Sequence, residues 1–139
     1  MIKGRTAAIT AVGAYVPDQV LSNTDLEQIV DTSDEWIRSR TGISERRMLK
    51  DKPTSFMAIQ AAKNLIERSS IDPKTIDLVL ISTSTPDMMI AATAAHVATE
   101  IGAIAAFGYD LQAACSGFLY GMSTACLLYT SPSPRDEQS

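Results

Sequence analysis

Short apolar stretches along this chain predict strands separated by helices. Residues 6–16 form an apolar segment closed by Gly13 and Pro17, which predicts a first strand. Residues 78–81 are apolar on both faces, as expected for a central strand of a covered sheet. Residues 105–111 predict a further strand.

Polar residues mark the predicted starts of the first two helices. Ser22 or Asn23 begins the first, whose expected apolar face consists of Leu26, Ile29 and Val30. Residues 32–35, Thr-Ser-Asp-Glu, begin the second, and Gly42 ends it.

Three longer helices are predicted in the rest of the chain. The first begins at Thr54 or Ser55 and runs to about residue 68, and the second covers residues 93–101. The third follows Cys115 and has Phe118, Leu119, Met122 and Ala125 at the spacing of a buried face. Strands that alternate with helices predict an α/β fold with a parallel, layered sheet and right-handed crossovers.

The amphipathic pattern stops near Leu127, and Pro132 and Pro134 prevent a continuing helix. A Ser/Pro linker is one interpretation. The interpretation we favour divides the chain into residues 1–126, a folded domain, and residues 127–139, a non-native or disordered tail. Cys126, at this junction, is assigned no role.

The composition is that of a globular protein, with 139 residues, 45% hydrophobic and 20% charged. A net charge of −4 gives no general attraction to nucleic acid, and no stretch is long and apolar enough to cross a membrane. The two cysteines and the lack of metal-ligand spacing predict a reducing, cytoplasmic location and no metal site.

Cys115 is the strongest candidate for chemistry. It follows a predicted strand, and its neighbours are all small, namely Ala113, Ala114, Ser116 and Gly117. Cysteine is often a small buried hydrophobe. At a strand-to-helix turn, however, the unpaired N–H groups of the helix start stabilise a thiolate and an oxyanion, and ligands collect at the carboxyl ends of strands. This position predicts a nucleophile suited to thioester chemistry.

Three motifs together resemble β-ketoacyl-acyl-carrier-protein synthase III. They are Asp-Thr-Ser-Asp-Glu-Trp-Ile at residues 31–37, Arg-Thr-Gly-Ile at 40–43 with Glu-Arg at 45–46, and Asp-Leu-Gln-Ala-Ala-Cys-Ser-Gly-Phe at 110–118. The resemblance extends from about residue 2 to residue 125 and includes the Thr-Ser-Thr-Pro-Asp loop at 83–87.

The resemblance implies a thiolase-like fold, of which this chain is the first of two similar α/β halves, layered with a mostly parallel mixed sheet, in a homodimer. It implies an acyltransferase that initiates type II fatty-acid synthesis. The acyl group of an acyl-CoA, with acetyl-CoA the expected primer, is loaded on Cys115 and condensed with malonyl-acyl carrier protein, with loss of carbon dioxide. No cofactor is implied beyond the coenzyme A thioester, which is a substrate.

Two further parts of a site are implied by the same resemblance. Trp36, Arg40 and Thr32 match residues that bind the nucleotide of coenzyme A, although a tryptophan and an arginine four residues apart can also form a structural cation–π pair. Ile90 matches a position that reaches across the dimer to the partner's acyl pocket. Ala91 stands where a proline is frequent, which leaves the primer undecided.

The catalytic histidine and asparagine of the family are not matched here. His96, the only histidine, lies in the predicted helix at 93–101 and does not correspond to the family's position. Two alternatives stay open: another thiolase-fold condensing enzyme, of the polyketide, alkylquinolone or hydroxymethylglutaryl-CoA type, or an incomplete and inactive chain. The segment of Trp36 and Arg40 disfavours the first.

Overall fold

The computed structural model describes residues 7–130, which form two compact units. The larger contains residues 7–14 and 54–130, and the smaller contains residues 15–53.

A parallel pair of strands lies at the centre of the larger unit. β3 (Leu78–Ser82) pairs with β4 (Phe107–Leu111), with Leu80 opposite Tyr109 and Ser82 opposite Leu111. Helix α4 (Thr93–Glu100) lies between them in sequence. The predicted strand–helix–strand order and its parallel pairing are confirmed.

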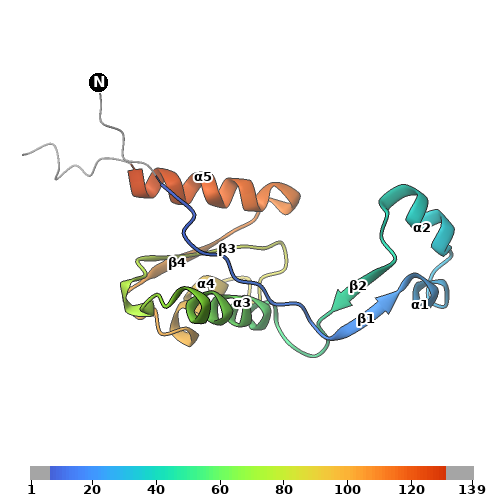
Figure 1. Cartoon of the computed structure of the whole chain (residues 1–139), viewed down its shortest axis with the longest axis horizontal. Helices are drawn as coiled ribbons and strands as arrows, with labels where there is room; N and C mark the ends of the chain where they lie inside the picture. Colours follow the sequence, from blue (N-terminus) through green and yellow to red (C-terminus); the bar gives the residue numbers. More distant parts are fainter. Residues whose placement is uncertain (1–6, 131–139) are drawn as a thin grey trace, which may run out of the picture. The chain divides into compact units, whose positions relative to one another are not determined.

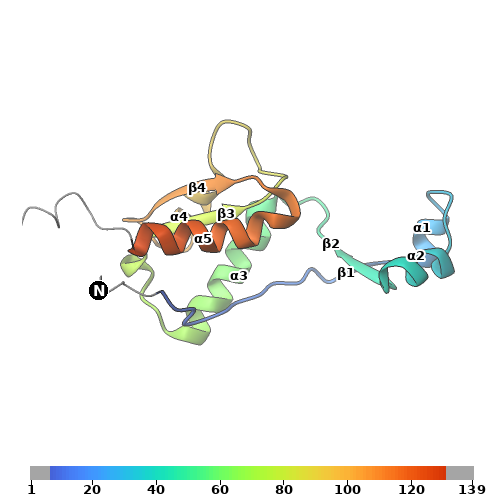
Figure 2. The same ribbon diagram turned by 90° about the horizontal axis from the view of Figure 1, so that it is seen from above.

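Helices cover both faces of this pair. Figures 1 and 2 show α5 (Gly117–Thr130) on one face, and α4 with α3 (Thr54–Ser69) on the other. The most buried apolar side chains belong to α4 and its surroundings, namely Ile59, Ala94, Val97, Ala98 and Ala103. The core of the larger unit therefore lies between α3, α4 and the strands.

A carboxylate from another segment of the chain holds the start of helix α4. The residue before α4, Ala92, makes no side-chain cap, and Asp110 of β4 supplies the acceptors instead. Its Oδ2 accepts from the N–H of Thr93 (2.7 Å) and its Oδ1 from that of Ala94 (2.8 Å). A short 3₁₀ helix, η1 (Pro73–Thr75), precedes β3.

The first predicted strand is wrong for residues 7–16, which have no regular secondary structure. This segment contacts helix α3 and does not pair with a strand. The N–H of Ala14 donates to Asn64 Oδ1 (3.2 Å), and a Cβ placed on Gly13 would lie 2.5 Å from Ala61 O and 2.6 Å from Leu65 N. The backbone reaches α3 this closely because residue 13 has no side chain.

The expected buried face of the last helix is also wrong. Phe118 is 70% exposed, Leu119 66% and Met122 40%. The buried positions of α5 are Gly117 and Gly121 instead. Glycine lets the helix backbone approach the strands, and this turns the larger apolar side chains away from them.

Helix α5 runs to Thr130, two residues before Pro132 and beyond the predicted boundary at residue 126. Cys126 is exposed on this helix. Residues 131–139 of the predicted tail lie outside the described residues, and the origin of the tail stays a prediction.

The smaller unit is an antiparallel strand pair that carries two helices. β1 (Gln19–Ser22) pairs with β2 (Glu45–Met48), and α1 (Asn23–Glu27) and α2 (Asp34–Thr41) lie between them in sequence. The predicted helix starts are confirmed: Ser22 forms a capping box with Asp25, and Ser33 accepts from the N–H of Trp36 (3.1 Å). Gly42 ends α2 in the left-handed conformation, with φ 72°.

Two features of this unit differ from the sequence prediction. Helix α1 ends at Glu27, and the N–H groups of Ile29 and Val30 both turn back to Leu26 O (2.9 Å each). Ile29 and Val30 are therefore outside the helix, and they are 68% and 54% exposed. The β1–β2 pair was not predicted, because the Glu-Arg-Arg-Met sequence of β2 has no apolar alternation.

Candidate active site

Cys115 lies on a single turn between strand β4 and helix α5. The turn is the 3₁₀ helix η2 (Ala114–Ser116), and Cys115 is exposed. The cysteine therefore precedes the first residue of α5, Gly117, rather than belonging to it. Its predicted place between a strand and a helix is confirmed, and its predicted place at the helix start is corrected by this turn.

The backbone at this turn is strained. Ala114 has φ 43°, in the left-handed region that L-residues with a side chain seldom adopt. Ser116 N–H donates to Ala113 O (3.0 Å), and Gly117 N–H donates to Ala114 O. The N–H of Cys115 is not among those that close the turn, so it is a candidate donor to an oxyanion formed on a thioester at its own sulfur.

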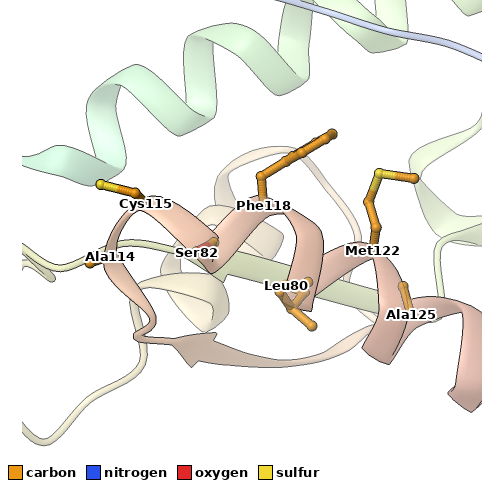
Figure 3. A pocket seen from close by; sticks show the side chains of 8 residues that line it. Leu80, Ser82, Ala114, Cys115, Phe118, Met122 and Ala125 are labelled. Carbon is orange, nitrogen blue, oxygen red and sulfur yellow. The ribbon is translucent and has the colours of Figure 1, made fainter.

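An open groove of about 610 Å³ runs from Cys115 along α5. Its lining is mostly apolar: Leu80, Ser82, Ala114, Cys115, Phe118, Gly121, Met122 and Ala125. In Figure 3, the side chains of Cys115, Phe118 and Met122 project from the same side of the chain, and Cys115 lies at one end of this row. The groove thus joins the exposed thiol of Cys115 to an apolar surface suited to an alkyl chain.

A close contact between Gly117 and Ser82 lies next to this turn. A Cβ placed on Gly117 would overlap Ser82 Oγ and lie 3.3 Å from Ser82 Cβ. Gly117 has φ −56°, which any residue adopts, so this position favours glycine for space rather than for backbone angle. Sequence reasoning missed Ser82, because one hydroxyl at the end of an apolar strand carries no signal of its partner.

Ile90 lies in a different hollow of the larger unit. A hollow of about 280 Å³ is formed by the loop before α4 and by β4, and its lining includes Met88, Met89, Ile90, Asp110 and Gln112. Met89 is 96% exposed and Ile90 is fully exposed. The structure thus places Ile90 at a projecting loop and does not bring it into the groove of Cys115.

The three candidate residues for coenzyme A lie together in the smaller unit. Thr32 and Trp36 line a hollow of about 400 Å³ with Asp31 and Ser33. The guanidinium carbon of Arg40 lies 4.6 Å from the centroid of the Trp36 ring. The structural cation–π pair therefore exists, yet Trp36 remains 53% exposed. A flat ring and a cation stand together at the surface next to a hollow.

His96 is exposed on α4 and lines none of the hollows described above. Within residues 7–130, no three histidine, cysteine, aspartate or glutamate residues are placed to hold a metal ion. No helix in that range has the length and apolar character needed to span a membrane.

Two curated proteins that are similar to this chain carry the same name. No protein-family model matches the chain. A β-ketoacyl-[acyl-carrier-protein] synthase III of Lactococcus lactis subsp. cremoris is 51% identical over 125 residues, which cover 90% of this chain and 38% of the relative. A relative in Chlorobium phaeobacteroides with the same name is 50% identical over 127 residues. The chain thus spans under two fifths of the relatives it matches.

Two solved structures superpose well on this chain. The 3-oxoacyl-[acyl-carrier-protein] synthase III of Aquifex aeolicus superposes with a TM-score of 0.79 at 44% identity, covering 83% of this chain and 37% of that protein. The priming β-ketosynthase of the R1128 polyketide pathway superposes with a TM-score of 0.86 at 36% identity, covering 92% and 39%. The described elements therefore have a thiolase-like α/β fold. In sequence and in fold, the chain belongs to the β-ketoacyl-[acyl-carrier-protein] synthase III family.

Proposed function

We propose that the protein containing this sequence is an acyltransferase that initiates fatty-acid synthesis, by joining an acyl group from acyl-CoA to a two-carbon unit from malonyl-acyl carrier protein. One observation carries the proposal. An exposed cysteine follows a parallel strand and opens on an apolar groove, in a chain about half identical to synthases of this name.

The chemistry follows from the thiol at Cys115. Its thiolate attacks the thioester carbonyl of the acyl-CoA, the carbonyl electrons move to oxygen, and collapse of the tetrahedral species expels the coenzyme A thiolate. Loss of carbon dioxide from the malonyl thioester then leaves a carbanion, which attacks the acyl-cysteine carbonyl and expels the Cys115 thiolate. A thiolate serves both steps because it is a nucleophile and a leaving group near neutral pH.

Support for nucleotide binding comes from the smaller unit. An exposed indole offers a stacking surface to adenine, and Arg40 offers a planar cation to phosphate. Thr32 adds a hydroxyl to the lining of the adjacent hollow. We assign these three residues to coenzyme A.

Further expectations about primer, location, assembly and cofactors belong to this proposal. The primer is acetyl-CoA, and the protein acts in the cytoplasm as a homodimer in which Ile90 helps to shape the partner's acyl pocket. No cofactor takes part beyond the coenzyme A thioester. The exposed loop of Met89 and Ile90 supports a role at an interface, because large apolar side chains at full exposure favour burial by another surface.

The acyl-carrier role is tested by mass spectrometry of the complete gene product after incubation with acetyl-CoA. An added acetyl group on the peptide containing Cys115 is expected, and Cys115→Ala should abolish it. Cys126→Ala is the matched control, since Cys126 is also an exposed thiol. An acetyl group found only on Cys126, or none at all, would refute the assignment.

The similarity to the R1128 priming enzyme suggests an alternative role in polyketide synthesis, with a different acyl-CoA primer. Its name assigns that enzyme to polyketide synthesis, and its fold matches this chain closely. Competition between acetyl-CoA and longer acyl-CoA thioesters for the Cys115 adduct separates the two. A strong preference for a longer primer would overturn acetyl-CoA as the proposed substrate and leave the cysteine chemistry in place.

A further inference from the structure

One buried amide in the smaller unit holds both ends of the helix that carries Trp36 and Arg40. Asn23, the first residue of α1, is only 1% exposed. Its Nδ2 donates to Asp34 Oδ1, at the first residue of α2, and to Ile43 O, just beyond the end of that helix, each at 2.8 Å. The start and the end of α2 thus share one donor group.

The two strands fix this amide in turn. Arg46 of β2 donates from Nη2 to Asn23 Oδ1 (2.9 Å) and from Nη1 to Leu21 O of β1 (3.2 Å). The N–H of Asn23 donates to Ser44 O (3.1 Å). The Arg46 guanidinium can only donate hydrogen bonds, so it must face the amide oxygen of Asn23. Asp34 Oδ1 and Ile43 O accept hydrogen bonds, so they must face the amide nitrogen.

Little else of α2 is buried. The helix has eight residues, and only Ile37 among them is buried. A helix this short has weak intrinsic stability, so its orientation depends on contacts outside it. The side-chain hydrogen bonds of Asn23 are part-buried, and two of them have a charged partner, Asp34 or Arg46, which makes them stronger than bonds between neutral groups.

We propose that Asn23 is a positioning residue for nucleotide recognition: it sets the orientation of α2, and through it the placement of the Trp36 ring and the Arg40 guanidinium against the nucleotide. This inference rests on the proposed binding of coenzyme A. Asn23 itself is buried and does not touch the ligand. Its removal should act on substrate affinity and leave the chemistry at Cys115 unchanged.

The first test is Asn23→Asp in the complete gene product. The substitution keeps the size of the side chain and the oxygen that accepts from Arg46. It removes the Nδ2 donor to Asp34 and Ile43, and it places a carboxylate against the carboxylate of Asp34. We expect the Kd for coenzyme A to rise about tenfold or more, because small misplacements of positioning groups have effects of this size. The KM for acetyl-CoA should rise in parallel, with the rate of Cys115 acetylation at saturating acetyl-CoA unchanged.

A second pair of variants avoids the buried position. The Asp34 side chain is 43% exposed, so its replacement is compatible with folding. Asp34→Ala removes the acceptor for Asn23, whereas Asp34→Asn removes the same charge and keeps an acceptor oxygen. We expect Asp34→Ala to weaken coenzyme A binding and Asp34→Asn to restore it. If Asn23→Asp does not fold, the comparison of Asp34→Ala with Asp34→Asn is sufficient to test the positioning role.

A control separates positioning from stability. Ile37→Ala removes the buried apolar side chain of α2 and leaves the amide network intact, so it should lower stability and retain affinity at a temperature where the variant is folded. If wild type binds coenzyme A and Asn23→Asp and Asp34→Ala bind equally well, the positioning role is wrong while the proposed function stands. If wild type does not bind coenzyme A, both are overturned.

Discussion

Replacing Asp110 by alanine tests how strongly the larger unit depends on one carboxylate. Its two oxygens accept from Thr93 N–H at 2.7 Å and from Ala94 N–H at 2.8 Å. These residues are 2% and 0% exposed, so water has little access to the amides that the substitution would leave without an acceptor. Each buried unsatisfied group costs about 1–3 kcal/mol. The expected loss is therefore about 2–5 kcal/mol in the free energy of unfolding.

Equilibrium urea unfolding of the complete gene product measures this loss. At an m value of about 2 kcal/mol per molar urea, the midpoint should fall by about 1–2.5 M. Asp77→Ala is the matched control, because it removes the same charge from an exposed residue beside β3. That control should change stability by less than about 0.5 kcal/mol. Amide hydrogen exchange should show faster opening of α4 in the Asp110 variant.

The reasoning would be refuted by an Asp110→Ala variant whose midpoint matches that of Asp77→Ala. Such a result would mean that water or a backbone shift satisfies both amides. The carboxylate would then be a local hydrogen-bond acceptor with little net effect on the fold.

Three further changes have defined outcomes. Val97→Ala removes a side chain that is 1% exposed and should lower the free energy of unfolding by about 2–4 kcal/mol, measured by the same urea titration. Trp36→Ala should weaken coenzyme A binding by roughly 5- to 150-fold, the loss of about 1–3 kcal/mol of stacking, and unchanged affinity in calorimetry would contradict the nucleotide assignment. Hydrogen bonds from the hydroxyl and then the backbone N–H of Ser22 lower the pKa of Asp25 below its ordinary value of 3.8. A lowered pKa in the folded state stabilises the fold above the ordinary pKa, and this contribution is lost as pH falls through the folded value. Ser22→Ala should therefore raise the pKa of Asp25 in an NMR titration, and an unchanged pKa would show that the capping box does not cause the shift.

Local hydrogen bonding explains what could be predicted along the chain. The capping box of Ser22 and Asp25, the cap at Ser33 and the left-handed end at Gly42 each join residues within four positions. Such contacts form whatever the rest of the molecule does, so residue type and spacing predict them. The pairing of Trp36 with Arg40 is of the same kind, because one turn of helix separates them.

Cys115 shows the limit of this reasoning. Its place after a strand and among small residues follows from the sequence, and so does its candidacy as a nucleophile. The 3₁₀ turn that carries it, with Ala114 at φ 43°, is not visible in any spacing. Next to this turn, Gly117 approaches Ser82 closely, and the two residues are far apart in the sequence.

The sequence by itself determined the order of the main helices and the parallel strands, the position of the candidate nucleophile and the family motifs. Only the tertiary structure decided that Asp110 of β4 holds the start of α4, that α5 faces the strands with glycines, and that Asn23 joins both ends of α2. The physical reason is common to all three. A glycine has no side chain to reveal its contact in a hydrophobic pattern, and a polar side chain does not reveal which distant backbone group it will meet. Short-range patterns record which surfaces are apolar, whereas the partners of buried polar groups are fixed only when the chain has folded.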